Sequence, residues 1–399
     1  MNKVNSILIL LLFVLGAGCG KGGDNDDDSL PNMSFEDITV NEGNGGTANI
    51  EITLTLNRAS SKEVSVKYTT VEGTAKATTD FTVATAQTIT FQPNETQKKI
   101  VIAVVADDIK ETDETFHVRV DNPVNVFLTK GTAVITLKND DTKIAFNNTG
   151  YDVGSNYPGY TLAWSDEFNT SVFDNSSWTA ESGDGCPGLC GWGNNELEFY
   201  MAPPANLFFQ DGKMIIEARA ETYGGKNYTS SRIKTQGKKS FKYGRVDIRA
   251  ILPKGKGIWP AFWMMPQNNV FGNWPSSGEI DILELIGSEP NKAYATVHYG
   301  PGPGSTNISR GYTLPGATFN DQFHVFSMEW EQDQMKFYID DNLYSTVNKT
   351  DLGAINYPFN ESFYFIINLA VGGNWPGAPD ASTVFPQWLI VDYVRIYQK

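Results

Sequence analysis

The sequence predicts an all-β protein. Its 399 residues include 37 Gly and 19 Pro, which favour frequent turns, and 12% of the residues are aromatic. Short stretches of alternating polar and apolar residues, rich in Val, Ile, Thr and Phe, recur along the chain, as half-buried strands require. The second half has no long apolar repeat of helical period to interrupt these stretches, so we expect sheets rather than helices there.

The first 30 residues are typical of an export signal followed by a tether. Residues 1–18 carry one positive charge, Lys3, and then an apolar run that is too short to span a membrane, which predicts a signal peptide. The sequence LGAGC at its end resembles a bacterial lipobox, and this implies cleavage before Cys19 and a lipid on that residue. Residues 19–30 contain the run GKGGDNDDD and predict an acidic tether.

The acidic run after Cys19 has two interpretations. It resembles the surface-export signal of some outer-membrane lipoproteins, or it is simply a solvated linker. We expect an exported, lipid-anchored protein of the outer membrane or cell surface, which contacts the membrane only through Cys19.

Residues 31–141 predict an immunoglobulin-like sandwich. Short alternating segments follow one another here with turn residues between them, as in such sandwiches. The segments are 49–56, 63–68, 87–91, 99–104, 115–120 and 133–137.

Acidic motifs between these segments resemble those of Calx-β domains, notably residues 40–43, 107–116 and 139–141. The resemblance implies a Ca²⁺ site at one end of the sandwich, since hard carboxylate oxygens suit this ion. The candidate ligands are Glu42, Asp80, Asp107, Asp108, Glu111, Asp140 and Asp141. The alternative is a set of solvated acids. Ala106 and Asn139 stand where calcium-binding members carry Asp, which favours weak binding or none.

A linker at residues 142–157 is expected to lead into a second domain at 158–399. This domain again shows strand patterns at short spacing, which predict a two-sheet jelly roll of about 240 residues. The predicted strands are 214–218, 244–250, 293–299, 325–330, 335–339, 364–369 and 389–397.

The run GEIDILE at residues 278–284 holds three carboxylates on one predicted strand. Side chains on a strand repeat every second residue, so Glu279 and Asp281 share a face and Glu284 falls on the opposite one. A β-bulge near Ile282 would return Glu284 to the acidic face. The alternative is an edge strand with a solvated acidic face, but the Trp, Gly and Pro residues on both flanks argue against it.

Three carboxylates on one buried face repel one another, so at least one of them holds a proton near neutral pH. Glycoside hydrolysis needs one ionised and one protonated carboxylic acid.

The acidic run and its flanks, GIWPAFWMM at 257–265 and NWPSS at 273–277, resemble the laminarinase branch of glycoside hydrolase family 16. The resemblance implies a concanavalin-like jelly roll and a retaining mechanism. It makes Glu279 the nucleophile, Glu284 the acid/base and Asp281 the residue that positions Glu279. It also places His298 in the cleft beside the acid/base, although a lone histidine is often structural.

The same resemblance implies further site residues. Catalysis needs no cofactor, and a structural calcium ion is expected on the convex side at Glu167, the carbonyl of Gly212 and Asp392. Several residues are expected to bind the sugar, although each could instead serve the core or a turn. They are Trp192, Asn194, Asn195, Arg232, Trp259, Trp263, Trp274, Asn368 and Trp375.

Two of the three cysteines, Cys186 and Cys190, form a close pair. In an exported chain a disulfide is the preferred interpretation, and a metal-binding pair is the alternative.

The net charge of −15 argues against nucleic acid and anionic membranes as partners and favours a neutral polysaccharide. We therefore expect a retaining endo-β-1,3-glucanase acting on laminarin-type β-glucans. A mixed-linkage β-1,3-1,4-glucanase and a non-catalytic glycan-binding lipoprotein are the alternatives. The sequence leaves the oligomeric state open.

Overall fold

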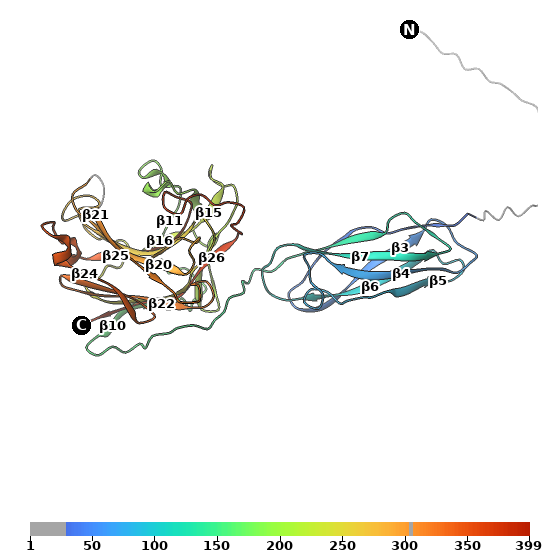
Figure 1. The fold of residues 1–399 in the computed structure, drawn as a ribbon, viewed down its shortest axis with the longest axis horizontal. Coiled ribbons are helices and arrows are strands. Elements are labelled where there is room, and N and C mark those ends of the chain that lie inside the picture. Colours follow the sequence, from blue (N-terminus) through green and yellow to red (C-terminus); the bar gives the residue numbers. More distant parts are fainter. Residues whose placement is uncertain (1–28, 303–305) are drawn as a thin grey trace, which may run out of the picture. The chain divides into compact units, whose positions relative to one another are not determined.

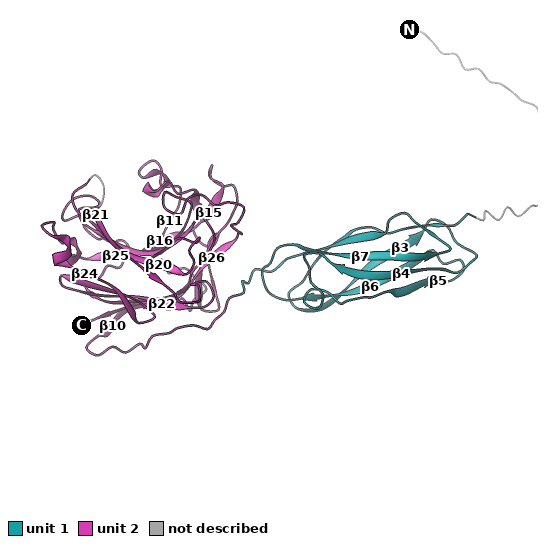
Figure 2. Cartoon of the chain, in the orientation of Figure 1, with its two compact units in different colours: residues 1–145 teal, residues 146–399 magenta. Residues whose placement is uncertain are grey.

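The computed structural model describes residues 29–302 and 306–399. The chain divides into two compact units, residues 1–145 and 146–399 (Figure 2). The predicted signal peptide, Cys19 and nearly all of the predicted tether lie outside the described residues.

Within the described ranges, no helix has the length and apolarity that crossing a membrane requires.

Unit 1 is the predicted sandwich, and its six predicted strands are confirmed. A four-stranded sheet has the order β6-β3-β1-β8, and a five-stranded sheet has the order β2-β9-β7-β4-β5. Alternate side chains of each long strand enter a core in which Phe81 and Phe116 stack at 4.2 Å. The strands are β1 (Asn32–Ser34), β2 (Ile38–Asn41), β3 (Gly46–Leu56), β4 (Val64–Glu72), β5 (Gln87–Phe91), β6 (Gln97–Ala106), β7 (Glu114–Val124), β8 (Phe127–Leu128) and β9 (Thr132–Lys138).

Unit 2 is the predicted jelly roll. An eight-stranded sheet has the order β13-β14-β26-β17-β22-β23-β24, with β10 also paired to β26. A seven-stranded sheet has the order β11-β16-β25-β18-β19-β20-β21. In Figure 1, β25 and β20 of the seven-stranded sheet lie over β22 of the other, and apolar side chains from both sheets form one core between them.

All seven strands that the pattern predicts in this unit are confirmed, and β19 carries the acidic run. The paired strands of unit 2 are β10 (Thr161–Asp166), β11 (Thr179–Glu181), β12 (Glu198–Tyr200), β13 (Leu207–Gln210), β14 (Lys213–Ala218), β15 (Tyr228–Ser230), β16 (Arg232–Lys234), β17 (Gly244–Ile251), β18 (Ile258–Pro266), β19 (Glu279–Leu285), β20 (Lys292–Tyr299), β21 (Thr306–Thr313), β22 (His324–Glu331), β23 (Gln334–Ile339), β24 (Asn342–Asn348), β25 (Phe363–Val371) and β26 (Gln387–Gln398).

The predicted linker needs a correction, because residues 146–157 belong to unit 2. The backbone N–H of Tyr151 donates to the carbonyl of Phe323 at 2.9 Å, and the hydroxyl of Tyr157 donates to Asp247 at 2.7 Å. In a free linker these two tyrosines would be surrounded by water, whereas here each is hydrogen-bonded to unit 2. Unit 2 therefore begins about a dozen residues earlier than the sequence pattern indicates.

Candidate active site

The predicted bulge is present in β19. Asp281 pairs with Thr296 of β20 and Glu284 pairs with Tyr294, so three steps along β19 face two steps along β20. On the other side, β18 pairs with Asp281 and Leu283 and skips Ile282. This extra residue changes the parity of the strand and gives Glu284 the same face as Glu279 and Asp281. Ile280, Ile282, Leu283 and Leu285 all enter the core instead.

Each of the three carboxylates has a different neighbour. The indole N–H of Trp274 donates to Oε2 of Glu279 at 2.6 Å, and the indole N–H of Trp259 donates to Oε1 of Glu284 at 3.1 Å. Oδ2 of Asp281 lies 3.4 Å from Nε2 of His298. The two outer carboxylates are partly exposed, whereas Asp281 is 2% exposed.

His298 lies opposite Glu279 in the β19–β20 register, and its ring also lies near Asp281 and Trp274. The family resemblance predicts His298 beside the acid/base Glu284, whereas the register and the ion pair place it beside Glu279 and Asp281. Its charge acts on both Glu279 and Glu284.

Burial raises the pKa values of both outer carboxylates, and their different neighbours separate the two values. For Glu284, burial raises the pKa well above its ordinary value, and the charges of Asp281 and Glu279 raise it further. For Glu279, burial also raises the pKa, but His298 and the hydrogen bond from Trp274 oppose the effect. Glu279 is therefore the acid that ionises more readily and Glu284 the one that keeps its proton. This is the pair that acid–base hydrolysis of a glycosidic bond requires.

Aromatic rings surround the carboxylates. Trp375 meets Trp259 edge-on with ring centroids 5.6 Å apart, and it meets Tyr294 at 5.3 Å. Trp274 is 48% exposed and Trp375 is 41% exposed, so both can offer a ring to a ligand. The predicted roles of Trp259, Trp274 and Trp375 fit this arrangement. Tyr294 was not predicted as a site residue, and its place beside the carboxylates follows from its pairing with Glu284 and its contact with Trp375.

A second polar group lies beside the first. The guanidinium of Arg232 sits between two rings, 4.5 Å from Trp192 and 4.9 Å from Trp263, and donates to Glu181 at 2.6 Å. Arg232 is close enough to favour the ionised form of Glu279. Trp192 and Trp263 therefore serve at least to hold Arg232. Glu181 was missed by the sequence reasoning, since a single acid on a short strand carries no local signal.

Of the three predicted sugar-binding asparagines, Asn368 is buried, whereas Asn194 and Asn195 are exposed. Asn368 accepts a hydrogen bond from the indole of Trp263 at 2.7 Å and donates to the hydroxyl of Tyr200 at 3.1 Å. That hydroxyl donates to Glu196 at 3.0 Å, and Asn194 donates to the same carboxylate at 3.3 Å. Asn195 instead donates to the side chain of Asn374 at 2.8 Å. The two unpredicted partners, Tyr200 and Glu196, are both buried.

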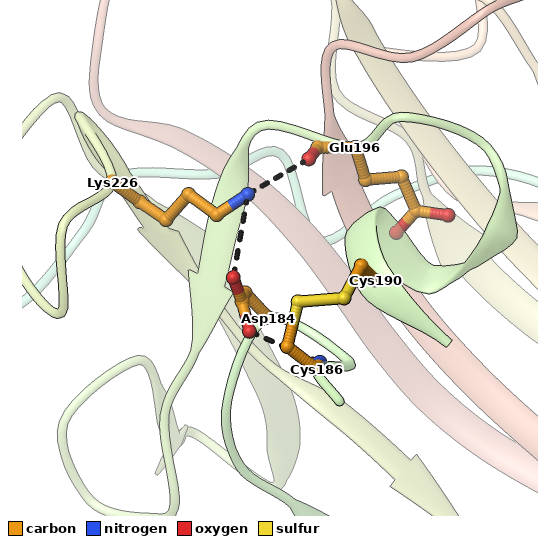
Figure 3. Close-up of a disulfide and its surroundings, with 5 residues drawn as sticks. All are labelled: Asp184, Cys186, Cys190, Glu196 and Lys226. Carbon is orange, nitrogen blue, oxygen red and sulfur yellow. Dashed lines mark hydrogen bonds and ion pairs between the residues drawn. A yellow bond between two sulfur atoms is a disulfide. The ribbon is translucent and has the colours of Figure 1, made fainter. Parts of the chain in front are cut away.

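The predicted disulfide between Cys186 and Cys190 is formed, with sulfurs 2.08 Å apart (Figure 3). Asp184 accepts a hydrogen bond from the backbone N–H of Cys186 at 3.1 Å. Lys226 lies 3.7 Å from Asp184 and donates to the backbone carbonyl of Glu196 at 3.4 Å (Figure 3). The loop so fastened leads directly into the short helix Cys190–Gly193, which carries Trp192.

The carboxylates of the expected structural calcium site have cationic partners. Glu167 makes a two-pronged contact with Arg395 at 2.9 and 2.8 Å. Asp392 pairs with Lys213 at 2.9 Å and also with Arg249. A calcium ion at Glu167, Gly212 and Asp392 would have to displace these cations, and the site stays a prediction.

In unit 1, most of the predicted acids do gather. Burial raises the pKa of Glu42 to about 7, and the charges of Asp107, Glu111, Asp141 and Asp80 add to the effect. Glu114, which was not predicted, belongs to the same acidic cluster, and burial raises its pKa to about 7 as well. Asp108 instead pairs with Lys143 at 3.1 Å, and Asp140 accepts the N–H of Gly43 at 2.9 Å.

Two family models match the chain. The model for glycosyl hydrolases family 16 matches residues 195–388, which contain all three carboxylates of β19. The model for the Calx-beta domain matches residues 24–141.

The chain is also similar to individual proteins. It is 42% identical over 262 residues to glucan endo-1,3-beta-glucosidase A1 from Niallia circulans, a match that covers 60% of this chain but 38% of that protein. It is 39% identical over 259 residues to a beta-glucanase from Rhodothermus marinus, covering 62% of this chain and 89% of the relative. Its structure matches endo-beta-1,3-glucanase from Pyrococcus furiosus with a TM-score of 0.57 and 46% identity, covering 60% and 94% of the two chains.

Replacing Trp274 with Phe should shift the acidic limb of the pH–rate profile for glycoside hydrolysis to higher pH. The substitution removes the donor that opposes the effect of burial on Glu279, so the pKa of Glu279 rises. Losing a hydrogen bond to a charged group should lower kcat/KM by about tenfold. The matched control is Trp375→Phe, another exposed indole, which should leave the acidic limb in place. An unshifted limb in Trp274→Phe would contradict this role.

Unit 1 should become less stable as pH rises from about 4.5 to about 7. The unfolded chain ionises Glu42 near its ordinary value of 4.5, whereas the folded unit does so near 7. The stabilisation is thus complete below the unfolded pKa and is lost as pH rises through the folded one. Calorimetry of the full chain should show the unit 1 transition at lower temperature at pH 8 than at pH 5. Glu42→Gln should reduce this difference, and Glu51→Gln, at an exposed acid, should not. Equal transition temperatures for the unmodified chain would refute the prediction.

Proposed function

The chain belongs to the glycosyl hydrolases of family 16, and we propose that it is a retaining endo-β-1,3-glucanase acting on laminarin-type glucans. The observation that carries the proposal is the bulged strand β19, which gives Glu279, Asp281 and Glu284 one common face. The relatives named above as endo-1,3-glucanases support the linkage.

In the proposed reaction, Glu279 attacks the anomeric carbon while protonated Glu284 donates its proton to the leaving oxygen. The hydrogen bond from Trp274 holds Glu279 ionised and oriented. Glu284 then takes a proton from a water molecule whose oxygen attacks the anomeric carbon and displaces Glu279, and the sugar leaves with its configuration retained. Asp281 positions Glu279, and its charge favours the protonated form of Glu284.

A neutral glucan suits the surroundings of these acids. The rings of Trp259, Trp274 and Trp375 offer flat apolar faces near the carboxylates, and sugar rings stack on such faces. A net charge of −15 would repel an acidic polysaccharide. Arg232 and Asn368 supply hydrogen-bonding groups from the neighbouring strands β16 and β25.

We also propose that the enzyme works at the cell surface, held by a lipid on Cys19. The apolar run that ends in this cysteine supports the proposal, although Cys19 lies outside the described residues. In the same way we propose Ca²⁺ binding at the acidic cluster of unit 1, which the raised pKa of Glu42 supports.

Because the proposed mechanism retains configuration, the first product of laminarin cleavage should be the β-anomer. NMR spectra recorded before mutarotation measure this. Glu284→Gln should lower kcat by about 10²- to 10⁴-fold, with partial rescue on substrates whose leaving group needs no proton. Glu279→Ser should abolish turnover and preserve binding, and Asp281→Asn should be milder than either. An α-configured first product would exclude Glu279 as the nucleophile. Equal turnover of lichenan would favour the mixed-linkage activity instead.

Cys19→Ser should move the protein from the membrane fraction to the soluble fraction of the exporting cell. The serine cannot accept the thioether-linked lipid, so the tether has no anchor. Fractionation followed by immunoblotting measures this. A Cys19→Ser protein that stays with the membrane would show that the anchor lies elsewhere.

A further inference from the structure

We propose that Glu279, Asp281 and His298 form a binding site for Zn²⁺, and that the bound ion inhibits the enzyme reversibly. The binding depends only on the geometry of these three side chains. The inhibition rests on the proposed function, in which Glu279 is the nucleophile.

The three side chains lie close enough together to share one metal ion. Each offers one ligand atom, and these atoms all lie within 4.8 Å of one another. Among residues 29–302 and 306–399, no other group of three or more such side chains has its ligand atoms this close together. Zinc bonds of about 2.1 Å in a tetrahedron place the ligand atoms roughly 3.4 Å apart. The distance from Nε2 of His298 to Oδ2 of Asp281 is 3.4 Å.

Asp281 provides a second reason to expect an ion. Its side chain is almost fully buried, and in the described part of the chain no hydrogen-bond donor reaches its Oδ2. This is the same oxygen that faces His298. A dication would supply the missing partner and would also remove the repulsion between Asp281 and Glu279.

The site is open for a metal to enter. Glu279 and His298 are partly exposed, so an ion can approach from the solvent side. Trp274 occupies Oε2 of Glu279, which leaves the other carboxylate oxygen for coordination. Three protein ligands leave a fourth position for water, as in zinc sites with an open position.

The ligand set selects the class of metal. Ca²⁺ takes six to eight oxygen ligands and Mg²⁺ prefers an octahedral oxygen shell, so neither suits a site with an imidazole nitrogen and two carboxylates. Imidazole suits Zn²⁺ and the neighbouring transition metals. A zinc ion on Glu279 would engage the carboxylate that must attack the anomeric carbon, so metal and substrate would exclude each other.

Isothermal titration of Zn²⁺ into the chelator-treated full chain tests the binding. His298→Gln and Asp281→Asn should each weaken the zinc affinity by at least about tenfold, since each removes a ligand. Glu284→Gln is the matched control, because it changes an acid on the same face that contributes no ligand, and its zinc affinity should equal that of the unmodified chain. Co²⁺ bound to the unmodified chain should give the visible absorption of a tetrahedral site, and His298→Gln should lose it.

In laminarin hydrolysis, Zn²⁺ should raise the apparent KM without lowering kcat, and EDTA should restore the original rate. Zinc affinities that are unchanged in both ligand variants would overturn the site and would place the bound ion elsewhere, for example on the acids of unit 1. Tight binding with undiminished activity would overturn the inhibition alone. Because binding is measured without substrate and basal activity is measured in chelator, failure of the proposed glucanase activity would be seen separately.

Discussion

The repulsion among three desolvated carboxylates on one strand is the constraint on which the rest of unit 2 depends. It exists because one extra residue, Ile282, shifts the parity of β19 and gives Glu284 the face of Glu279 and Asp281. Without the bulge, Glu284 would point into the apolar core, where an acid has no partner. With it, burial and mutual repulsion hold the pKa of Glu284 far above that of a free carboxylic acid. The energetic cost of gathering these acids is the source of their reactivity.

Residues on other strands and loops modify the pKa values of these carboxylates. Trp274 donates an indole hydrogen bond to Glu279 and Trp259 donates one to Glu284, and each bond favours the ionised form of its carboxylate. Arg232, fixed between Trp192 and Trp263, adds a positive charge close to Glu279. The disulfide (Figure 3) fastens the loop that leads to Trp192, one of the two rings that hold Arg232.

In unit 1, burial and the repulsion between neighbouring acids also raise the pKa of a carboxylic acid. Its acids meet at the loops between strands and not on the face of a single strand, and no tryptophan lies among its described residues to orient them. Burial and repulsion raise the pKa of Glu42, so the cluster stores a strain that a cation would relieve. In unit 2 the proposed mechanism uses this repulsion to keep Glu284 protonated, whereas in unit 1 it makes the predicted stability depend on pH.

The two all-β units, their predicted strands, the bulge and the cysteine pair could be predicted from the sequence, because each leaves a local signal within a few residues. Alternating polar and apolar residues indicate a strand. Glu284 lies an odd number of residues after Glu279 and Asp281, so all three can share a face only if the strand contains a bulge. Only the tertiary structure decided which indole meets which carboxylate, since Trp259 and Trp274 reach β19 from different parts of the chain. It also attached residues 146–157 to unit 2 and gave Glu167 and Asp392 their cationic partners. Glu181 and Tyr200 were missed for the same reason, since their partners Arg232 and Asn368 are distant in sequence. Glu196 enters the site through Tyr200, to which it is hydrogen-bonded.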